Sequence, residues 1–137
     1  MDSLLDTSVV SQRIKKSPDE RVVRWLSTIL RDEAFLSVVT LQELRTGIDL
    51  LPAGFKRRDL ESWLVSDIHR GYEGRILPIN EEIADVCGRI IARGKKAGAT
   101  PEMNDALIAA TAQVHHLRIA TLNRKHFERL GVELVEF

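Results

Sequence analysis

The sequence predicts an α/β fold of three layers, in which helices cover both faces of a mostly parallel sheet of five strands. Short apolar segments alternate with longer stretches of helical periodicity along the chain, a pattern typical of parallel sheets. The chain has 137 residues and 44% hydrophobic content, which suits one domain over residues 1–137 with a core of its own. No repeat, low-complexity tract or Pro/Gly/Ser linker divides it.

Local signals define the elements of the first third in order. A short apolar run predicts the first strand over residues 3–5. The run Ser17-Pro18-Asp19-Glu20 has the pattern of a capping box with proline at the first helical position, and the apolar spacing after it predicts a helix over 19–30. Residues 34–39 form the second predicted strand, and a helix follows over about 40–51.

The remainder of the chain continues this alternation. A stripe of leucine and isoleucine predicts a helix over 55–72, and residues 75–79 form a strand that Pro78 places at an edge. Asn80 is the predicted cap of a helix over 80–96. The last predicted elements are a helix over 101–116, a strand over 119–121, a short helix over 124–130 and a fifth strand over 132–135.

Charge and cysteine content exclude several classes. Twenty basic and twenty acidic residues cancel, which excludes a nucleic-acid binder that works by bulk charge but not a local basic patch. The single cysteine, Cys87, allows no internal disulfide, and its apolar neighbours at helical spacing favour a core thiol over a reactive one. No signal peptide and no apolar stretch near about 20 residues is present, so the expected location is the cytoplasm, without a membrane.

Three acids, Asp6, Glu43 and Asp105, stand where a strand leads into a helix or at a helix N-terminus. Reactive groups of open α/β sheets collect beyond the carboxyl ends of the strands, so each acid is a candidate for chemistry. Each also has a structural interpretation. Asp6 could cap the helix that begins near Thr7, Glu43 could form a capping box with Thr40, and Asp105 could favour the positive end of its helix. Spacing alone leaves both interpretations open.

Four segments form an ordered set of motifs, over residues 4–10, 37–47, 105–112 and 119–127. Together they resemble PIN-domain ribonucleases, particularly the VapC/FitB-like toxins of prokaryotic toxin–antitoxin pairs, and the resemblance covers essentially the whole chain. It implies a PIN-like fold in which Asp6, Glu43 and Asp105 converge on Mg²⁺ or Mn²⁺. Hard divalent cations prefer oxygen ligands, and a cation relieves the repulsion between clustered carboxylates.

The fourth motif departs from the family pattern. Family members often carry another acid at the position of Asn123 or of His126, and neither residue is acidic here. Asn123 can offer a carbonyl oxygen to a metal-bound water. His126 is open to two interpretations, a phosphate contact or proton shuttle, and an exposed loop residue in a basic run. Three carboxylates suffice for one cation, whereas a second would need substrate phosphates as ligands.

We therefore expect a metal-dependent endoribonuclease that acts as the toxin of a two-component system. Asp6, Glu43 and Asp105 would hold the cation, which activates water for attack on a phosphodiester, and Asn123 would orient water. Candidate substrate contacts are Thr7, Arg45, Arg124 and His126. The resemblance also implies an RNA substrate, a VapB-like antitoxin, and either a homodimer or a hetero-oligomer with that antitoxin.

Several surfaces keep alternative interpretations. Lys15 and Lys16 would form a basic rim with the run after residue 123 if the strand order brings these loops together, whereas Lys56 belongs to a solvated helix end. Trp25 and Trp63 would line an antitoxin groove or a dimer surface, or lie in the core.

Two rival functions come from other classes. A haloacid-dehalogenase-like phosphatase would use Asp6 as its nucleophile, but it needs a second acid where Ser8 stands. A non-catalytic PIN-like binding or scaffold partner would carry a site degraded at the fourth motif. Metal-dependent RNA cleavage that is lost on Asp6→Ala separates these possibilities.

Overall fold

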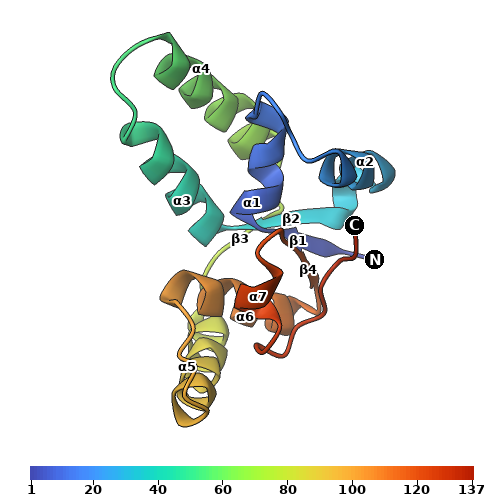
Figure 1. Cartoon of the computed structure of the whole chain (residues 1–137), viewed down its shortest axis with the longest axis vertical. Coiled ribbons are helices and arrows are strands. Elements are labelled where there is room, and N and C mark those ends of the chain that lie inside the picture. Colours follow the sequence, from blue (N-terminus) through green and yellow to red (C-terminus); the bar gives the residue numbers. More distant parts are fainter.

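The computed structural model describes residues 1–137 and contains a parallel sheet of four strands between two layers of helices (Figure 1). The strand order is β3-β2-β1-β4, and each neighbouring pair is parallel. The strands are β1 (Ser3–Leu5), β2 (Ala34–Ser37), β3 (Ile76–Leu77) and β4 (Arg118–Ala120). The three-layer arrangement is therefore as predicted, and β3 occupies the edge that Pro78 indicates.

The predicted fifth strand is wrong, because residues 132–135 do not join the sheet as a strand. They form one isolated parallel bridge, between Ile119 and Leu134. Two hydrogen bonds hold this bridge, from the Ile119 amide to the Glu133 carbonyl at 2.8 Å and from the Val135 amide to the Ile119 carbonyl at 2.9 Å. Of the three residues of β4, only Ile119 pairs on this side.

Helices of the N-terminal half cover one face of the sheet, and helices of the C-terminal half cover the other (Figure 1). The first layer contains α1 (Thr7–Val10), η1 (Ser11–Ile14), α2 (Glu20–Thr28), η2 (Arg31–Glu33), α3 (Val38–Asp49), α4 (Phe55–Trp63) and the π-helical η3 (Leu64–Arg70). The second layer contains α5 (Glu81–Lys96), α6 (Met103–His115) and α7 (Arg124–Phe127).

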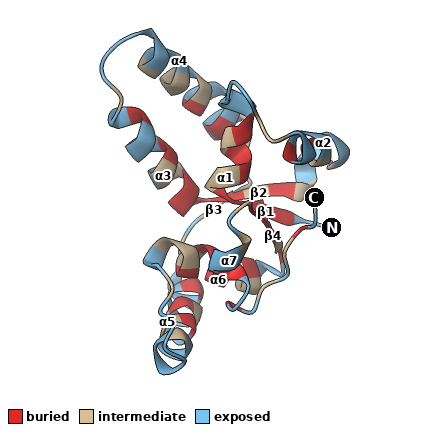
Figure 2. Cartoon of the chain, in the orientation of Figure 1, coloured by how far each residue is buried: buried red, intermediate tan, exposed pale blue.

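Buried residues form two clusters, one on each face of the sheet (Figure 2). Successive strand residues alternate between them: Leu4 and Ile119 belong to the cluster of α5 and α6, whereas Leu5 and Ala120 belong to the cluster of the first layer. Cys87 lies in the cluster of α5 and α6, and burial raises the pKa of its thiol. The prediction that Cys87 is a core thiol is therefore confirmed.

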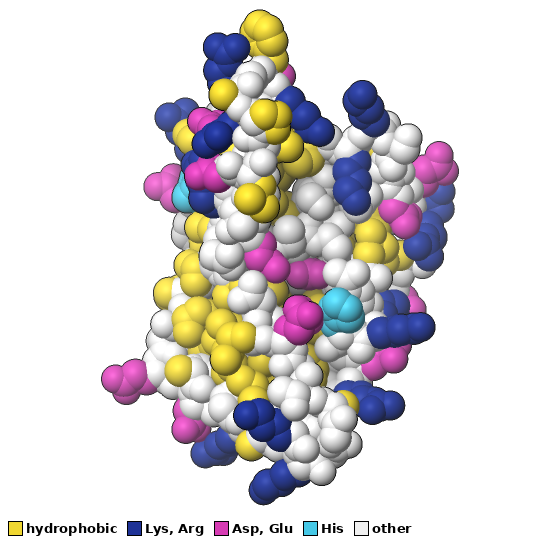
Figure 3. Space-filling view, turned by 60° about the vertical axis from the view of Figure 1, so that its left-hand side comes forward, with side chains coloured by type: hydrophobic (Ala, Val, Ile, Leu, Met, Phe, Trp, Pro, Cys, Tyr) yellow, Lys and Arg dark blue, Asp and Glu magenta, His cyan; other side chains and the backbone are white.

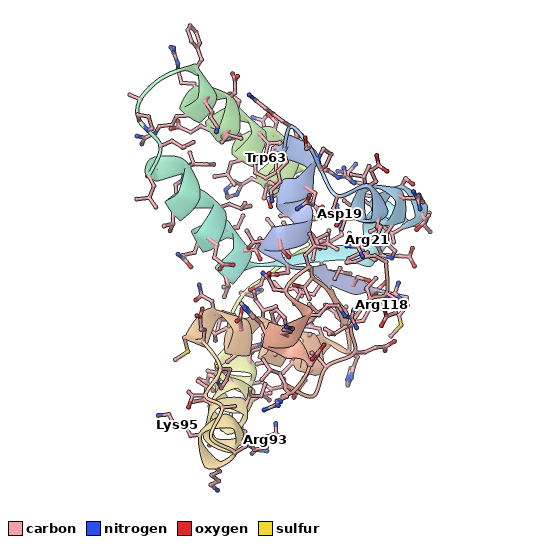
Figure 4. The ribbon with its side chains drawn as sticks, viewed as in Figure 1. Asp19, Arg21, Trp63, Arg93, Lys95 and Arg118 are labelled. Atoms are coloured by element: carbon pink, nitrogen blue, oxygen red, sulfur yellow. The ribbon has the colours of Figure 1, made fainter.

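Two helix starts differ from the prediction. Asp19 rather than Ser17 caps α2, since its carboxylate accepts a hydrogen bond from the Arg21 amide at 2.9 Å, and Pro18 precedes the helix (Figure 4). Ser37 caps α3, with its hydroxyl accepting from the Val39 amide at 3.0 Å. Helix α3 therefore begins at Val38, two residues earlier than expected, and β2 ends correspondingly early.

Other elements follow the prediction with shorter bounds. Asn80 caps α5 by accepting from the Ile83 amide at 2.9 Å, as expected. The helix predicted over 55–72 consists of α4 followed directly by η3. Helix α6 begins at Met103 rather than at residue 101, and α7 ends at Phe127 rather than at residue 130.

Both tryptophans are half-buried against the first-layer cluster, so they contribute to the core of the isolated chain. The Trp25 ring meets the Phe137 ring edge to face, with 5.5 Å between the centroids, and the Arg118 guanidinium lies 6.0 Å from the Trp25 centroid. Trp63 ends α4 (Figure 4). None of the helices combines the length and apolarity that crossing a membrane requires.

Candidate active site

The three acids gather at the carboxyl edge of the sheet. Asp6 directly follows β1, and Glu43 lies in the second turn of α3, which directly follows β2. Because β1 and β2 are parallel neighbours, their carboxyl ends meet at one edge. Helix α6 places Asp105 in its first turn and is linked to α3 by a hydrogen bond from Asn104 Nδ2 to Gln42 Oε1 at 3.2 Å. Figure 3 shows acidic side chains gathered beside a histidine near the middle of one face.

The pKa of Asp105 is affected by the other acids of this edge. Burial raises the pKa of its carboxyl above the usual value, and the negative charges of Asp6, Glu102 and Glu43 act in the same direction. The charge of His126 acts against them. The acids therefore interact electrostatically although they lie far apart in the sequence.

Asp6 is buried and held by two hydroxyl groups. Its Oδ2 accepts hydrogen bonds from Ser8 Oγ at 3.0 Å and from Thr121 Oγ1 at 2.8 Å. Asp6 occupies the N-cap position of α1, but its side chain makes no capping hydrogen bond. The capping interpretation of this carboxylate is therefore wrong, and its Oδ1 makes no hydrogen bond within the protein.

Glu43 faces the start of α1. Its Oε1 accepts a hydrogen bond of 2.7 Å from Thr7 Oγ1, a residue that the sequence suggests as a substrate contact. Because Ser37 caps α3, both Thr40 and Glu43 lie inside the helix, and the capping-box interpretation of Glu43 is wrong. The hydroxyl of Thr7 instead fixes this carboxylate beside Asp6.

Asp105 pairs with His126. The His126 Nδ1 lies 3.1 Å from Asp105 Oδ2, and the imidazole is 53% exposed whereas the carboxylate is 19% exposed. His126 belongs to the short helix α7, so it is neither in a loop nor without a partner. The position of Asp105 in the first turn of α6 agrees with a favourable interaction with the helix N-terminus, whereas its role as a metal ligand stays a prediction.

Thr121 joins Asp6 to the fourth motif. Besides donating to Asp6, its hydroxyl accepts a 2.9 Å hydrogen bond from the Asn123 amide. Ser8 makes a parallel link, because its hydroxyl accepts from the Leu122 amide at 3.0 Å. Asn123 occupies the N-cap position of α7, with an exposed side chain that makes no capping bond. Sequence reasoning missed Ser8 and Thr121 as supports of the site, although both are hydroxyl residues inside the motifs.

Comparisons with known proteins identify this architecture. The family model described as PIN domain matches residues 3–133. The chain belongs to the PIN-domain family. This PIN domain is 39% identical over 124 residues to the toxin FitB of Neisseria gonorrhoeae, which covers 90% of this chain and 89% of FitB. It is 31% identical over 132 residues to the VapC ribonuclease Y4jK of Sinorhizobium fredii, covering 96% and 94% of the two chains. The crystal structure of FitAcB from Neisseria gonorrhoeae superposes with a TM-score of 0.92 at 36% identity, over 98% of this chain and 96% of that chain.

Two predicted substrate contacts of this PIN domain, Arg45 and Arg124, form ion pairs within the chain. Arg45 forms an ion pair with Asp49 at 3.2 Å on the exposed side of α3. Arg124 donates to the Val135 carbonyl at 2.8 Å and pairs with Glu136 at 2.9 Å, so it ties down the C-terminal segment. A contact of either arginine with substrate stays a prediction.

Lysines of the PIN domain line a groove beside the first-layer helices. Lys15, Lys16 and Lys56 share an open cavity of about 1110 Å³ between η1, the end of α3 and the start of α4, with Asp59 as the one acid of the lining. Lys56 is exposed at the start of α4, as expected of a solvated helix end, and it lines the same cavity as the pair after η1. Lys125 and His126 of α7 line a different cavity, together with Asp105.

The three carboxylates of the PIN domain are suitable ligands for a hard cation, but they do not surround a common point. No three His, Cys, Asp or Glu side chains surround a common point as a metal cluster. Asp6, Glu43 and Asp105 each use one oxygen in the contacts above, namely Oδ2, Oε1 and Oδ2. The other oxygen of each makes no hydrogen bond within the protein. Three unpaired carboxylate oxygens are the ligands that Mg²⁺ and Mn²⁺ prefer.

Proposed function

We propose that this PIN domain is a metal-dependent endoribonuclease and the toxin of a toxin–antitoxin pair. The observation that carries the proposal is the set of three acids from three different elements, each with one carboxylate oxygen unpaired, on a chain that resembles FitB and Y4jK over almost its whole length. FitB is named a toxin and Y4jK a ribonuclease. One PIN domain over residues 1–137 acting in the cytoplasm would suffice for this activity.

Asp6, Glu43 and Asp105 would hold Mg²⁺ or Mn²⁺, which when bound supplies an activated water and a positive charge near the phosphodiester. The protein's own contribution is orientation. Two hydroxyls fix Asp6 and one fixes Glu43, so these carboxylates are positioned before substrate arrives. No protein nucleophile is required, and Ser8, bonded to Asp6, occupies the place where a phosphatase of the haloacid-dehalogenase type would need its second acid.

The fourth motif would assist on the substrate side. The backbone amide of Asn123 donates to Thr121, which donates to Asp6, and from this position the exposed Asn123 side chain would orient a water molecule. His126 contacts Asp105 through Nδ1 and is half exposed, so the imidazole can turn to donate a hydrogen bond to a substrate phosphate. This role needs no fourth acid.

The lysine groove offers a route for the RNA backbone. Helix α1 begins beside Asp6, and η1 leads from its end to Lys15 and Lys16. Lys56 faces them across the same groove. Three lysines against one acid favour phosphate, and such binding weakens as salt rises. The resemblance to FitB and VapC proteins further supports a VapB-like antitoxin as partner, in a homodimer or a hetero-oligomer.

The test is cleavage of a mixed RNA pool by the purified protein. Cleavage should require Mg²⁺ or Mn²⁺, stop in EDTA and be lost in Asp6→Asn, which preserves shape but removes the charge. Glu128→Gln is the matched control, because this acid is exposed and lies on the C-terminal side of α7. A folded wild-type protein that cleaves no RNA with either metal would favour the non-catalytic scaffold. If the wild type does cleave the pool, sequencing of the cut ends identifies the target.

A further inference from the structure

A further cavity, separate from the lysine groove and from the cavity next to Asp105, lies at the opposite end of the sheet from the three acids. Its volume is about 460 Å³, and it lies among the end of α2, η2 and the end of η3. Ala34, the first residue of β2, and Arg75, just before β3, both line it. The cavity is therefore at the amino ends of these strands, whereas the acids follow the carboxyl ends. The four residues of β2 separate the two sites by about 13 Å.

The lining is strongly basic. Arg13, Arg31 and Arg75 face the cavity together with one acid, Asp67. None of these four residues takes part in an ion pair, since all ion pairs of the structure involve other side chains. The positive charge of the three arginines is therefore not neutralised by a carboxylate contact.

Arg75 is held in place by neutral groups. Its guanidinium donates hydrogen bonds to the carbonyls of Arg31, Ala34 and Gly71, and Arg31 donates to the Gly71 carbonyl at 3.2 Å. These bonds fix the guanidinium but bring no negative charge. Arg13 is exposed and makes no side-chain hydrogen bond, so its donors are available to a ligand.

Tyr72 adds a neutral donor. Its ring lies 5.0 Å from the Arg75 guanidinium carbon, and its hydroxyl has no hydrogen-bond partner in the protein. Burial raises the pKa of the Tyr72 phenol, with Arg13 and Arg75 acting in the opposite direction, so the hydroxyl keeps its proton at neutral pH.

We propose that this cavity binds a phosphate group carried by a small organic molecule of the size of a nucleoside monophosphate. Arg13, Arg31 and Tyr72 supply donors from three separate segments of the chain, enough for the three terminal oxygens of a phosphate, whereas a carboxylate has only two oxygens. An apolar wall for the organic part consists of Leu26, Ile29 and Leu30. The volume lies within the range of about 300–1,000 Å³ that is usual for ligand cavities.

The test is calorimetric titration of the full-length protein with AMP, inorganic phosphate and adenosine. EDTA in every titration prevents phosphate from binding through a metal at the acids. We expect AMP to bind more tightly than inorganic phosphate, because only AMP reaches the apolar wall, and adenosine to give no measurable binding. The double substitution Arg13→Gln/Arg31→Gln should weaken AMP binding by at least about tenfold, the effect of losing one charged hydrogen bond. Tyr72→Phe should weaken it several-fold.

The control is Arg24→Gln/Arg93→Gln, which removes the same charge from exposed arginines outside the cavity and should leave AMP affinity unchanged. Unfolding midpoints without ligand show that each variant is folded. Equal binding of AMP and adenosine, wild-type affinity in the Arg13/Arg31 variant, or no binding of AMP and phosphate by the wild type would each overturn the proposal. Equal binding of AMP and inorganic phosphate, lost in the double variant, would support the site and identify free phosphate as its ligand.

Discussion

Replacing Thr121 by valine removes a single hydroxyl that supports both the fold and the acid Asp6. The residue is 1% exposed. Its Oγ1 donates to the Asp6 carboxylate at 2.8 Å and accepts from the Asn123 amide at 2.9 Å. Valine has nearly the same shape, so the substitution removes the two hydrogen bonds without opening a cavity.

The expected loss follows from these two bonds. A hydrogen bond to a charged group contributes about 1.5–3 kcal/mol and a neutral one about 0.5–1.5 kcal/mol, which gives a loss of about 2–4.5 kcal/mol for Thr121→Val. At about 4 °C per kcal/mol for a chain of this size, the unfolding midpoint should fall by about 8–18 °C. Because Asp6 loses one of its two hydroxyl supports, RNA cleavage should also fall by about 10–100-fold.

Two other buried threonines provide matched controls. Thr111 is fully buried, and its hydroxyl makes one neutral bond, to the Leu107 carbonyl at 2.7 Å, so Thr111→Val should cost about 0.5–1.5 kcal/mol. Thr40 is also fully buried, and its Oγ1 has no hydrogen-bond partner. Thr40→Val should therefore cost nothing and stabilise the protein by about 1 kcal/mol or more, because it removes an unsatisfied polar group.

Urea unfolding of the wild type and the three variants in EDTA measures these changes in the free energy of unfolding directly. The dependence of the free energy of unfolding on urea concentration should be the same for all four proteins if they unfold to the same extent. The expected order of stability is Thr40→Val, wild type, Thr111→Val, Thr121→Val. A Thr121→Val protein no less stable than Thr111→Val would refute the argument, since it would show that the bond to the Asp6 carboxylate contributes nothing. Destabilisation by Thr40→Val would contradict the absence of a partner for that hydroxyl.

Three further predictions concern charge, backbone conformation and RNA binding. Burial and the neighbouring acids raise the pKa of Asp105, so its ionised form destabilises the metal-free fold. Asp105→Asn should therefore abolish cleavage yet raise the unfolding midpoint in EDTA. This gain in stability should be absent below the pKa of the carboxyl in the unfolded chain and should grow as pH rises toward its pKa in the folded chain. Gly88→Ala, in α5 with open space around its Cβ position, should stabilise by about 0.5–1 kcal/mol, whereas Gly131→Ala should destabilise because φ is +72° there. Lys15→Gln and Lys56→Gln should each reduce the salt dependence of RNA binding by about 0.7 in the log–log slope.

Each of these has a distinct contrary result. An Asp105→Asn protein that gains no stability at neutral pH would show that neither burial nor the neighbouring acids disfavour the ionised carboxyl in the folded chain. Equal effects of alanine at Gly88 and Gly131, measured by thermal unfolding, would contradict the positive φ of the latter. An unchanged salt slope in both lysine variants, measured with catalytically inactive Asp6→Asn protein, would place the RNA outside the lysine groove.

The boundary between β2 and α3 shows what local sequence signals resolve. The alternation of strands and helices is legible because buried strands and amphipathic helices have different apolar periods. Val38 and Val39 are apolar and β-branched, which favours a strand, yet the Ser37 hydroxyl caps the chain and starts the helix there. Serine caps helices as readily as it forms turns, so the sequence does not distinguish the two without the surrounding packing.

The candidate site likewise has features that the sequence predicts and features that it does not. The positions of Asp6 at a strand end and of Asp105 in the first turn of a helix are local properties and follow from the pattern, whereas Glu43 lies one turn further into α3 than predicted. Their supporting contacts are not local: Thr121 meets Asp6 across 115 residues. A hydroxyl residue can serve as a cap, a turn or a carboxylate partner, and only the parallel pairing of β1 with β4 in the sheet decides between these roles.

Although the net charge of the chain is zero, acidic and basic residues gather at opposite ends of the sheet. At the carboxyl edge three acids lie close together, and His126 is the one cation in ion-pair contact with any of them. At the amino edge three arginines face a cavity without a carboxylate contact. Each end therefore carries an excess of charge of one sign, even with His126 beside the acids and Asp67 beside the arginines, and a ligand of the opposite sign would reduce each excess. If so, EDTA-treated protein should be stabilised independently by Mg²⁺ and by AMP, and their effects on the unfolding midpoint should add, because β2 lies between the two sites and no side chain contacts both.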